Sequence, residues 1–300
     1  MSEIRPFARH DREQLTSLVN AHIKAVIPGW SIPTAALLNQ MEREPGEYIV
    51  DPWVIDRETW VAIERDRVAA AAHLHRYGAD APVGPPYRNA AAISWYVCWP
   101  DHLEAGHHLM AAIVKRLDAW SPRVQYLDVS LPATLAYGVQ DAWPHLRVLA
   151  QDAGFSDAQG RTELQLLLSV DRVGPPGPAP VAGLQVRRRL ERFGAAFIAM
   201  LDDREVGLLD VDDDFTRNGT MLRCDGWADV GDLTIAPEHR RNGIATWLLQ
   251  QAAEWLRLGG TRNLIAYLDE DELDSVPAHW YRAAGFTELN RTRRGWCRPT

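Results

Sequence analysis

The chain has 300 residues, of which 46% are hydrophobic and 24% charged, a composition typical of a folded protein with one large or two ordinary domains. Its net charge of −8 argues against nucleic acid as a partner. Its three cysteines are too few and too widely spaced to indicate a disulfide framework or a metal site. No apolar run reaches transmembrane length, and the first residues lack the apolar stretch of a signal peptide, so we expect no membrane partner and a cytoplasmic location.

The first half of the chain predicts strands, helices and a long helical region over about residues 12–43. Strands are expected at residues 60–64, 68–73, 92–98 and 124–129. Helices are expected over about residues 103–120 and in a segment ending near residue 153, before Gly154 and Phe155.

Residues 171–183, DRVGPPGPAPVAG, contain four prolines within six positions and predict a stiff connector that is not packed against other elements. We therefore predict one domain over residues 1–170, a linker over residues 171–182, and a second domain over residues 183–300.

The second half predicts strands at residues 183–190, 195–201, 206–211, 227–235, 263–268 and 286–289. Residues 202–204 form the expected hairpin turn between the second and third of these strands. An amphipathic helix is expected to follow Gly243 and to end at Gly259-Gly260, and a second helix is expected over residues 275–284.

Residues 233–245, LTIAPEHRRNGIA, combine a short strand, a turn containing Gly243 and the start of a helix. The first N–H groups of a helix have no partner within it, and the macrodipole adds positive charge there. Gly243 allows a ligand to approach closely, and Arg240 and Arg241 supply charges suited to phosphate oxygens. The stretch predicts a phosphate-binding loop, although an ordinary strand-to-helix turn would also fit the bare glycine pattern.

The spacing of Pro237, Arg240, Gly243 and Ala245 resembles the acyl-CoA signature of the GNAT superfamily of N-acyltransferases. A second family element follows at its expected place, where Tyr281 precedes Gly285 in the segment HWYRAAGF. The resemblance implies an α/β fold, with a mixed central sheet flanked by helices, and acetyl-CoA as the co-substrate. It assigns the cofactor contacts to Leu233, Thr234, Ile235, Arg240, Arg241, Asn242, Gly243, Ile244, Ala245 and Thr246.

The first half repeats this pattern in a weakened form. Pro100 and Gly106 repeat the six-residue step from Pro237 to Gly243, and QDAGF at 151–155 echoes RAAGF at 282–286. The first half has Leu103, His108 and Ala150 where the second half has Arg240, Ala245 and Tyr281. We therefore expect two tandem GNAT-like domains, of which the first is degenerate and has a structural or substrate-shaping role.

The resemblance also implies the catalytic groups. Backbone N–H groups of the strand ending at Ile235 would polarise the thioester carbonyl, and Tyr281 would protonate the leaving thiolate, although this side chain also fits a core aromatic. Asp229 matches the position of a carboxylate base in the family. Asp232 is a second candidate base, on the opposite face if the strand is regular. Either aspartate also fits a solvated strand edge.

Two acidic segments bear on the acceptor. Asp210 and residues 212–214 follow one expected strand, and the acidic residues among 269–274 follow another. Such charge would attract a cationic amine, although a solvated loop explains it equally well. We predict acetyl transfer from acetyl-CoA to a primary amine of a small cationic molecule, by a monomer or a homodimer and without a metal. The alternatives are a non-catalytic acyl-CoA sensor or scaffold, and the same fold with another acyl-CoA donor.

Overall fold

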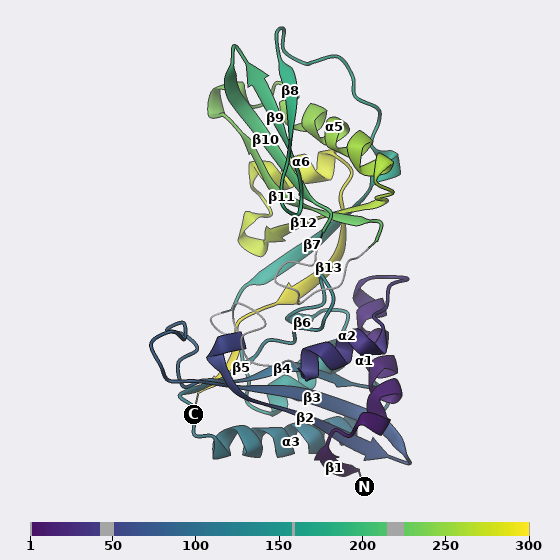
Figure 1. The fold of residues 1–300 in the computed structure, drawn as a ribbon, viewed down its shortest axis with the longest axis vertical. Coiled ribbons are helices and arrows are strands. Elements are labelled where there is room, and N and C mark those ends of the chain that lie inside the picture. Colours follow the sequence, from purple (N-terminus) through teal and green to yellow (C-terminus); the bar gives the residue numbers. More distant parts are fainter. Residues whose placement is uncertain (1, 43–50, 158–159, 215–224, 300) are drawn as a thin grey trace. The chain divides into compact units, whose positions relative to one another are not determined.

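The computed structural model describes residues 2–42, 51–157, 160–214 and 225–299. The described chain forms two compact units (Figure 1). Residues 2–163 and 290–299 form the N-terminal unit, and residues 164–214 and 225–289 form the C-terminal unit. The chain therefore returns to the first unit after building the second.

The N-terminal unit contains a six-stranded sheet in the order β1-β2-β3-β4-β5-β14. These strands are β1 (Glu3–Pro6), β2 (Val54–Glu64), β3 (Arg67–Tyr77), β4 (Ala91–Cys98), β5 (Val124–Leu127) and β14 (Trp296–Pro299). Neighbouring strands are antiparallel except β4 and β5, which are parallel. The sheet is thus mixed, as the sequence predicts, but its last strand comes from residues 296–299, where the sequence predicts none.

Helices cover both faces of this sheet. In Figure 1, α1 (Arg12–Val26) and α2 (Thr34–Met41) lie on one face, and α3 (Leu103–Ala119) lies on the other. The shorter α4 (Pro144–Asp152) contacts α3 and β4. The helical region expected over about residues 12–43 consists, in its described part, of these two helices, α1 and α2. Pro28, Gly29 at φ +82° and Pro33 separate α1 from α2, because neither proline nor left-handed backbone continues a helix.

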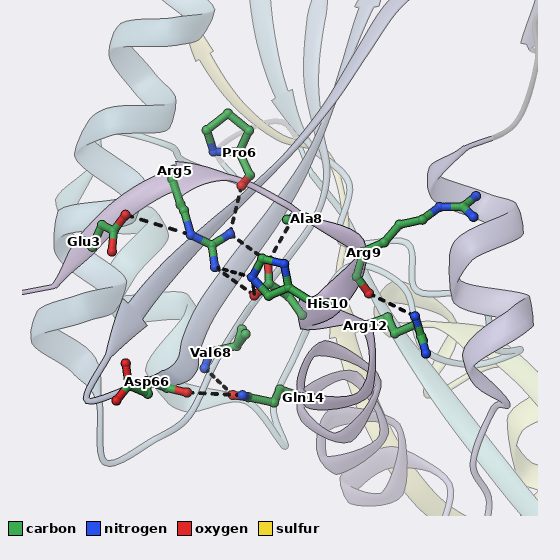
Figure 2. A network of polar contacts seen from close by, with 11 residues as sticks. Glu3, Arg5, Pro6, Ala8, Arg9, His10, Arg12, Gln14, Asp66 and Val68 are labelled. Atoms are coloured by element: carbon green, nitrogen blue, oxygen red, sulfur yellow. Dashed lines mark hydrogen bonds and ion pairs between the residues drawn. The ribbon is translucent and has the colours of Figure 1, made fainter.

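Polar contacts fix the start of α1 to the sheet (Figure 2). Asp11, whose side chain is almost fully buried, accepts hydrogen bonds from the backbone N–H of Ala8 at 2.9 Å and from Arg5 at 2.7 and 2.8 Å. The Gln14 amide donates to the carbonyl of Asp66 and accepts from the N–H of Val68, so it holds the β2–β3 hairpin. These contacts satisfy backbone groups at the points where β1 leads into α1 and where β2 turns into β3.

The C-terminal unit is built on a sheet in the order β13-β7-β12-β11-β10-β9-β8. Its strands are β7 (Thr162–Ser169), β8 (Gln185–Leu190), β9 (Gly194–Leu201), β10 (Arg204–Asp212), β11 (Trp227–Ile235), β12 (Asn263–Asp269) and β13 (Thr287–Arg293). The last residues of β13 belong to the N-terminal unit, where they pair with β6 (Val139–Gln140). The expected strands are present, and β7 is an additional one that the sequence does not predict.

Two helices accompany this sheet, α5 (Ile244–Leu258) and α6 (Val276–Ala283). The apolar side of α5 packs on β9, β10 and β11 around Leu209, Val211 and Leu248. Only residues 191–193 separate β8 from β9, so the C-terminal unit has no counterpart of α1 and α2 at this point.

The proline-rich segment after β7 differs from the unpacked connector that its composition predicts. It lies along α5, because Arg257 donates to the carbonyl oxygens of Val170 and Val173, and the Trp247 indole donates to that of Gly177 at 3.2 Å. The segment is therefore hydrogen-bonded to α5, the helix that follows the phosphate-binding loop.

None of the helices that the structure describes is long and apolar enough to cross a membrane.

Candidate active site

The site forms where β11 and β12 separate. These two parallel strands pair only at Trp227↔Asn263, Ala228↔Leu264 and Asp229↔Ile265, although β11 continues to Ile235 and β12 to Asp269. Beyond Asp229, β11 is no longer paired with β12. Backbone groups of β11 are thereby available to a ligand inserted between the two strands.

The predicted phosphate-binding loop follows β11 directly. After Ala236 comes a short turn of 3-10 helix, Pro237–His239, and then exposed Arg240, whose Nε donates to the carbonyl of Ile235 at 3.0 Å. Arg241 has φ +61°, and Gly243 has φ +79° directly before the first residue of α5. These left-handed positions reverse the chain before α5, and residues 240–243 are exposed at the N-terminal end of this helix.

Close packing shapes the inner side of this loop. Ile244 is buried in the core, and Ala245 and Ile235 are half-buried. A Cβ at Gly207 would lie 2.6 Å from Cδ1 of Ile235 and 3.4 Å from Cγ2 of Ile244. Gly207 therefore makes room for the end of β11 against α5. Nothing in the local sequence pattern identifies this glycine, because the contact depends on strand pairing.

The position of α6 brings Tyr281 to the end of the sheet where the phosphate-binding loop lies. Ser275 caps the helix through its hydroxyl oxygen, which accepts from the N–H of Ala278. The Trp280 indole donates to Oγ1 of Thr246 at 3.2 Å, which connects α6 to the first turn of α5. Tyr281 is only 7% exposed, and its ring lies edge-on to Phe286. Burial, with the negative charges of Asp232 and Glu272, raises the pKa of Tyr281 to about 12.

The candidate bases lie on one face, in contrast to the expectation for a regular strand. Val211 pairs with Val230, but Asp210 pairs with Asp232, so Gly231 is an extra residue that forms a β-bulge in β11. The bulge shifts the alternation by one residue and turns Asp232 to the face that carries Asp229. The predicted opposite placement is wrong for this reason, since a bulge cannot be inferred from alternation alone.

Four carboxylates surround this bulge: Asp210 and Asp212 from β10, and Asp229 and Asp232 from β11. Asp212 lies directly opposite Asp229 and is 3% exposed. A Cβ at Gly231 would lie 3.4 Å from Oδ2 of both Asp210 and Asp212, so the glycine leaves space between acidic side chains. Of the other acidic residues expected near the acceptor, 213 and 214 follow β10, and the segment after β12 begins with a short turn, Glu270–Glu272.

The N-terminal unit repeats the separation of strands and the bulge but not the chemistry. Parallel pairing of β4 and β5 ends at Ile93↔Leu127, and Ser94 is the extra residue in β4. His73 and His75 stand on β3 at the positions that Asp210 and Asp212 occupy on β10. His73 is buried and His75 is half-buried, and the loss of solvation lowers the pKa of both and keeps them neutral. Their nitrogens lie 3.1 Å apart and the His73 ring stacks on Trp95, so side chains fill this face.

Within the described residues, no group of three or more histidine, cysteine, aspartate or glutamate side chains is arranged to hold a metal ion.

Comparisons with known proteins agree with this geometry. Residues 193–288 match the family described as "Acetyltransferase (GNAT) domain". Aminoglycoside N(6')-acetyltransferase type 1 from Acinetobacter haemolyticus is 27% identical over 103 residues, which are 34% of this chain and 68% of that protein.

Two solved structures share the fold of the whole chain. A tandem GNAT protein from the clavulanic acid biosynthesis pathway has a TM-score of 0.61 at 18% identity, and the similarity covers 100% of this chain and 98% of that one. A GCN5-related N-acetyltransferase from Sphaerobacter thermophilus has a TM-score of 0.60 at 15% identity, with 99% and 95% covered.

The fold, the matched domain and the loop before α5 define an N-acetyltransferase enzyme. Residues 193–288 match the GNAT family, and the whole chain shares its fold with a tandem GNAT protein.

Proposed function

We propose that the protein transfers an acetyl group from acetyl-CoA to a primary amine of a small, multiply cationic acceptor. The observation that carries this proposal is the set of four aspartates around the Gly231 bulge, beside the point where β11 and β12 separate. Acidic side chains gathered beside the site favour a ligand with more than one ammonium group. The similarity to an aminoglycoside acetyltransferase supports the same class of acceptor.

The donor half of the reaction is assigned to the loop and the strand before it. Arg240, Arg241 and the N–H groups of Asn242 to Thr246 would hold the phosphates of acetyl-CoA at the N-terminal end of α5. Leu233, Thr234 and Ile235 would place backbone N–H groups beside the acyl group. A hydrogen bond from such an N–H to the thioester oxygen favours the tetrahedral transition state, because the oxygen gains charge there.

The acceptor amine must lose a proton before it attacks. An alkylamine of pKa about 10.4 is neutral in roughly one molecule in 2,500 at pH 7, which corresponds to about 4.6 kcal/mol. We assign the proton acceptor to Asp229, with Asp232 as the alternative on the same face. The neutral amine nitrogen then bonds to the acyl carbon, the carbon–sulfur bond breaks, and the nitrogen, now cationic, releases its second proton to solvent to leave the amide. Tyr281 protonates the departing thiolate and regains its proton from solvent.

The division of labour in the chain is part of this proposal. Catalysis is assigned to the domain predicted over residues 183–300. The domain predicted over residues 1–170 is assigned a structural or substrate-shaping role; residues 171–182, the predicted linker, lie within the C-terminal unit. We expect a cytoplasmic monomer or homodimer. The rival functions are binding of acyl-CoA without turnover, and transfer of a different acyl group.

The test is a thiol-release assay with acetyl-CoA and a panel of acceptors: a polyamine, an aminoglycoside, a monoamine and a neutral alcohol. We expect turnover to increase with the number of ammonium groups. Asp229→Asn should reduce turnover, whereas Asp203→Asn, in the exposed β9–β10 turn, should not. Binding of acetyl-CoA without release for any amine would favour the non-catalytic function. Release only with succinyl-, malonyl- or longer-chain CoA would correct the donor.

A further inference from the structure

A pocket of about 750 Å³ lies entirely within the N-terminal unit, outside the site described above. Its walls come from the loop before β4, the end of β5, and the segments before β6, β7 and β14. The lining residues that matter are Tyr87, Tyr126, Asp128, Tyr137, Arg161 and Arg294. This pocket has no part in the proposed acetyl transfer.

Asp128 is the unusual charge in this pocket. It follows β5, and its backbone is fixed by hydrogen bonds from its own N–H to the carbonyl of Ile93 and from the N–H of Gly138 to its carbonyl. Within the described part of the chain, its carboxylate has neither a hydrogen bond nor an ion pair, and it is only partly accessible from the pocket. Burial raises its pKa to about 6, against the opposing charge of Arg294.

The two guanidinium groups of the pocket are directed to a different carboxylate. Arg294 lies 3.4 Å and Arg161 3.8 Å from Oε2 of Glu163, and the Oε1 atom of Glu163 accepts a hydrogen bond from the Tyr137 hydroxyl. Arg294 also lies over the Tyr137 ring, 5.1 Å from its centre. Both arginine side chains are about half exposed, so solvent screens them further. Glu163 therefore offsets one of the two positive charges, and Asp128 has no hydrogen bond or ion pair with either arginine, although the charge of Arg294 acts on it through space.

Aromatic rings lie beside Asp128. The Tyr87 and Tyr126 rings are 5.3 Å apart, and the Tyr126 hydroxyl donates to the carbonyl of Pro86, which holds its ring in place. The negative charge of Asp128 is the main reason why the pKa of Tyr87 is raised to about 12, so the carboxylate lies close to this phenol. Aromatic faces with a nearby carboxylate attract alkylammonium groups, through cation–π and charge interactions together.

We propose that this pocket is a second ligand site, which binds an organic ammonium ion between Asp128 and the rings of Tyr87 and Tyr126. The site is separate from the acyl-CoA loop, and its ligand is bound without being acetylated there. The degenerate N-terminal unit would then sense or retain a cationic molecule.

The probe for this site is tetramethylammonium, which has no N–H to acetylate and therefore reports binding alone. The full chain is labelled at tyrosine with ¹³C and ¹⁵N, and Tyr87→Phe and Tyr126→Phe assign the two signals. We expect saturable shifts of these signals with tetramethylammonium, and none with the neutral isostere tert-butanol or with sodium at the same ionic strength. Asp128→Asn should weaken binding about tenfold or more, whereas Asp80→Asn, an exposed acid of the same unit, should not.

The pH dependence gives a second readout. With a pKa of about 6, Asp128 is ionised in about one molecule in eleven at pH 5 and in about ten of eleven at pH 7. The dissociation constant should therefore fall about tenfold over this interval, and Asp128→Asn should remove the dependence. The other charged groups at the pocket are Arg161, Arg294 and Glu163.

Several results would overturn the proposal: no saturable shift, equal affinity in Asp128→Asn, equal binding of tert-butanol, or tighter binding of acetate than of tetramethylammonium. Loss of the Tyr87 and Tyr126 shifts in Asp229→Asn would also contradict it, because that residue belongs to the other unit. Failure of acetyl transfer would not affect it.

Discussion

The phenol of Tyr281 offers the sharpest test of the proposed chemistry. Within the described residues its hydroxyl has no hydrogen-bond partner, so Tyr281→Phe removes the acid without leaving an unsatisfied polar group. We therefore expect an unchanged or slightly higher melting temperature together with a loss of turnover.

The size of that loss follows from the raised pKa. General acids contribute about 10²- to 10⁴-fold to rate. Complete proton transfer from a phenol of pKa about 12 to a thiolate of pKa about 8.5 is uphill by about 3.5 units, or roughly 4.8 kcal/mol. Tyr281 should therefore act as a hydrogen-bond donor that shares its proton as the carbon–sulfur bond breaks. This places the expected effect at the lower end, about 100-fold in kcat, or about 2.7 kcal/mol.

The assay is steady-state thiol release over pH 6 to 10.5 with saturating acetyl-CoA. The KM for acetyl-CoA should change little. Tyr281 should also produce no alkaline decline below about pH 11, because its pKa is raised. The control is Tyr96→Phe, which removes a buried hydrogen bond to the carbonyl of Gly106 in the N-terminal unit, and should lower stability without lowering turnover. A Tyr281→Phe enzyme within threefold of the normal kcat would refute the acid assignment, and an alkaline limb near pH 10 that this variant abolishes would refute the raised pKa.

Four further outcomes are expected. Asp229→Asn should lower kcat about 10²- to 10³-fold with little change in the KM for acetyl-CoA; a normal kcat would move the base to Asp232 or to water. Arg240→Ala should raise the KM for acetyl-CoA about tenfold, through loss of a phosphate contact and of the bond to the Ile235 carbonyl, and an unchanged KM would remove it from the phosphate site. Asp128→Asn should stabilise the protein at pH 7 by up to about 3 kcal/mol, less any effect of partial solvent access. A raised carboxyl pKa destabilises the fold as pH rises from about 3.8 through about 6, so denaturant titrations at pH 4 and 7 should show the gain only at pH 7. Burial lowers the pKa of His22 to about 4. Between about pH 6.5 and 4, this histidine is therefore protonated in the unfolded chain but neutral in the folded chain. This should cost about 3 kcal/mol between pH 6.5 and 4, and His22→Asn should flatten that part of the stability curve.

The sequence predicted the elements that depend on local pattern. The strand before Pro237, the turn at Gly243 and the helix after it are present, because turn glycines and helical periodicity are local signals. What the sequence could not reveal depends on pairing between distant segments. The bulge at Gly231 exists only in register with β10, and it changes which aspartates share a face. The contact of Gly207 with the end of β11 and the hydrogen bonds of the proline-rich segment to α5 likewise require the folded sheet.

The tandem fold was predicted from weak echoes, and the structure explains why they are weak. The N-terminal sheet keeps the strand order and the bulge at Ser94, both determined by the backbone. Where the C-terminal sheet has aspartates around its bulge, the N-terminal sheet has His73, His75 and Trp95. Whether Tyr281, Asp229 and the loop residues perform the roles assigned to them stays a prediction.

The pairing of β14 with β5 has a consequence for how the chain can be made and divided. Residues 296–299 supply the edge of the first sheet, so during synthesis this sheet stays incomplete until nearly all of the described chain has left the ribosome. A fragment ending near residue 170 would expose the backbone of β5, and an open edge of this kind recruits other strands and promotes aggregation. Independent expression of the first unit would therefore need residues 290–299 joined to it through a new loop, so the protein cannot be divided by a single cut between its units.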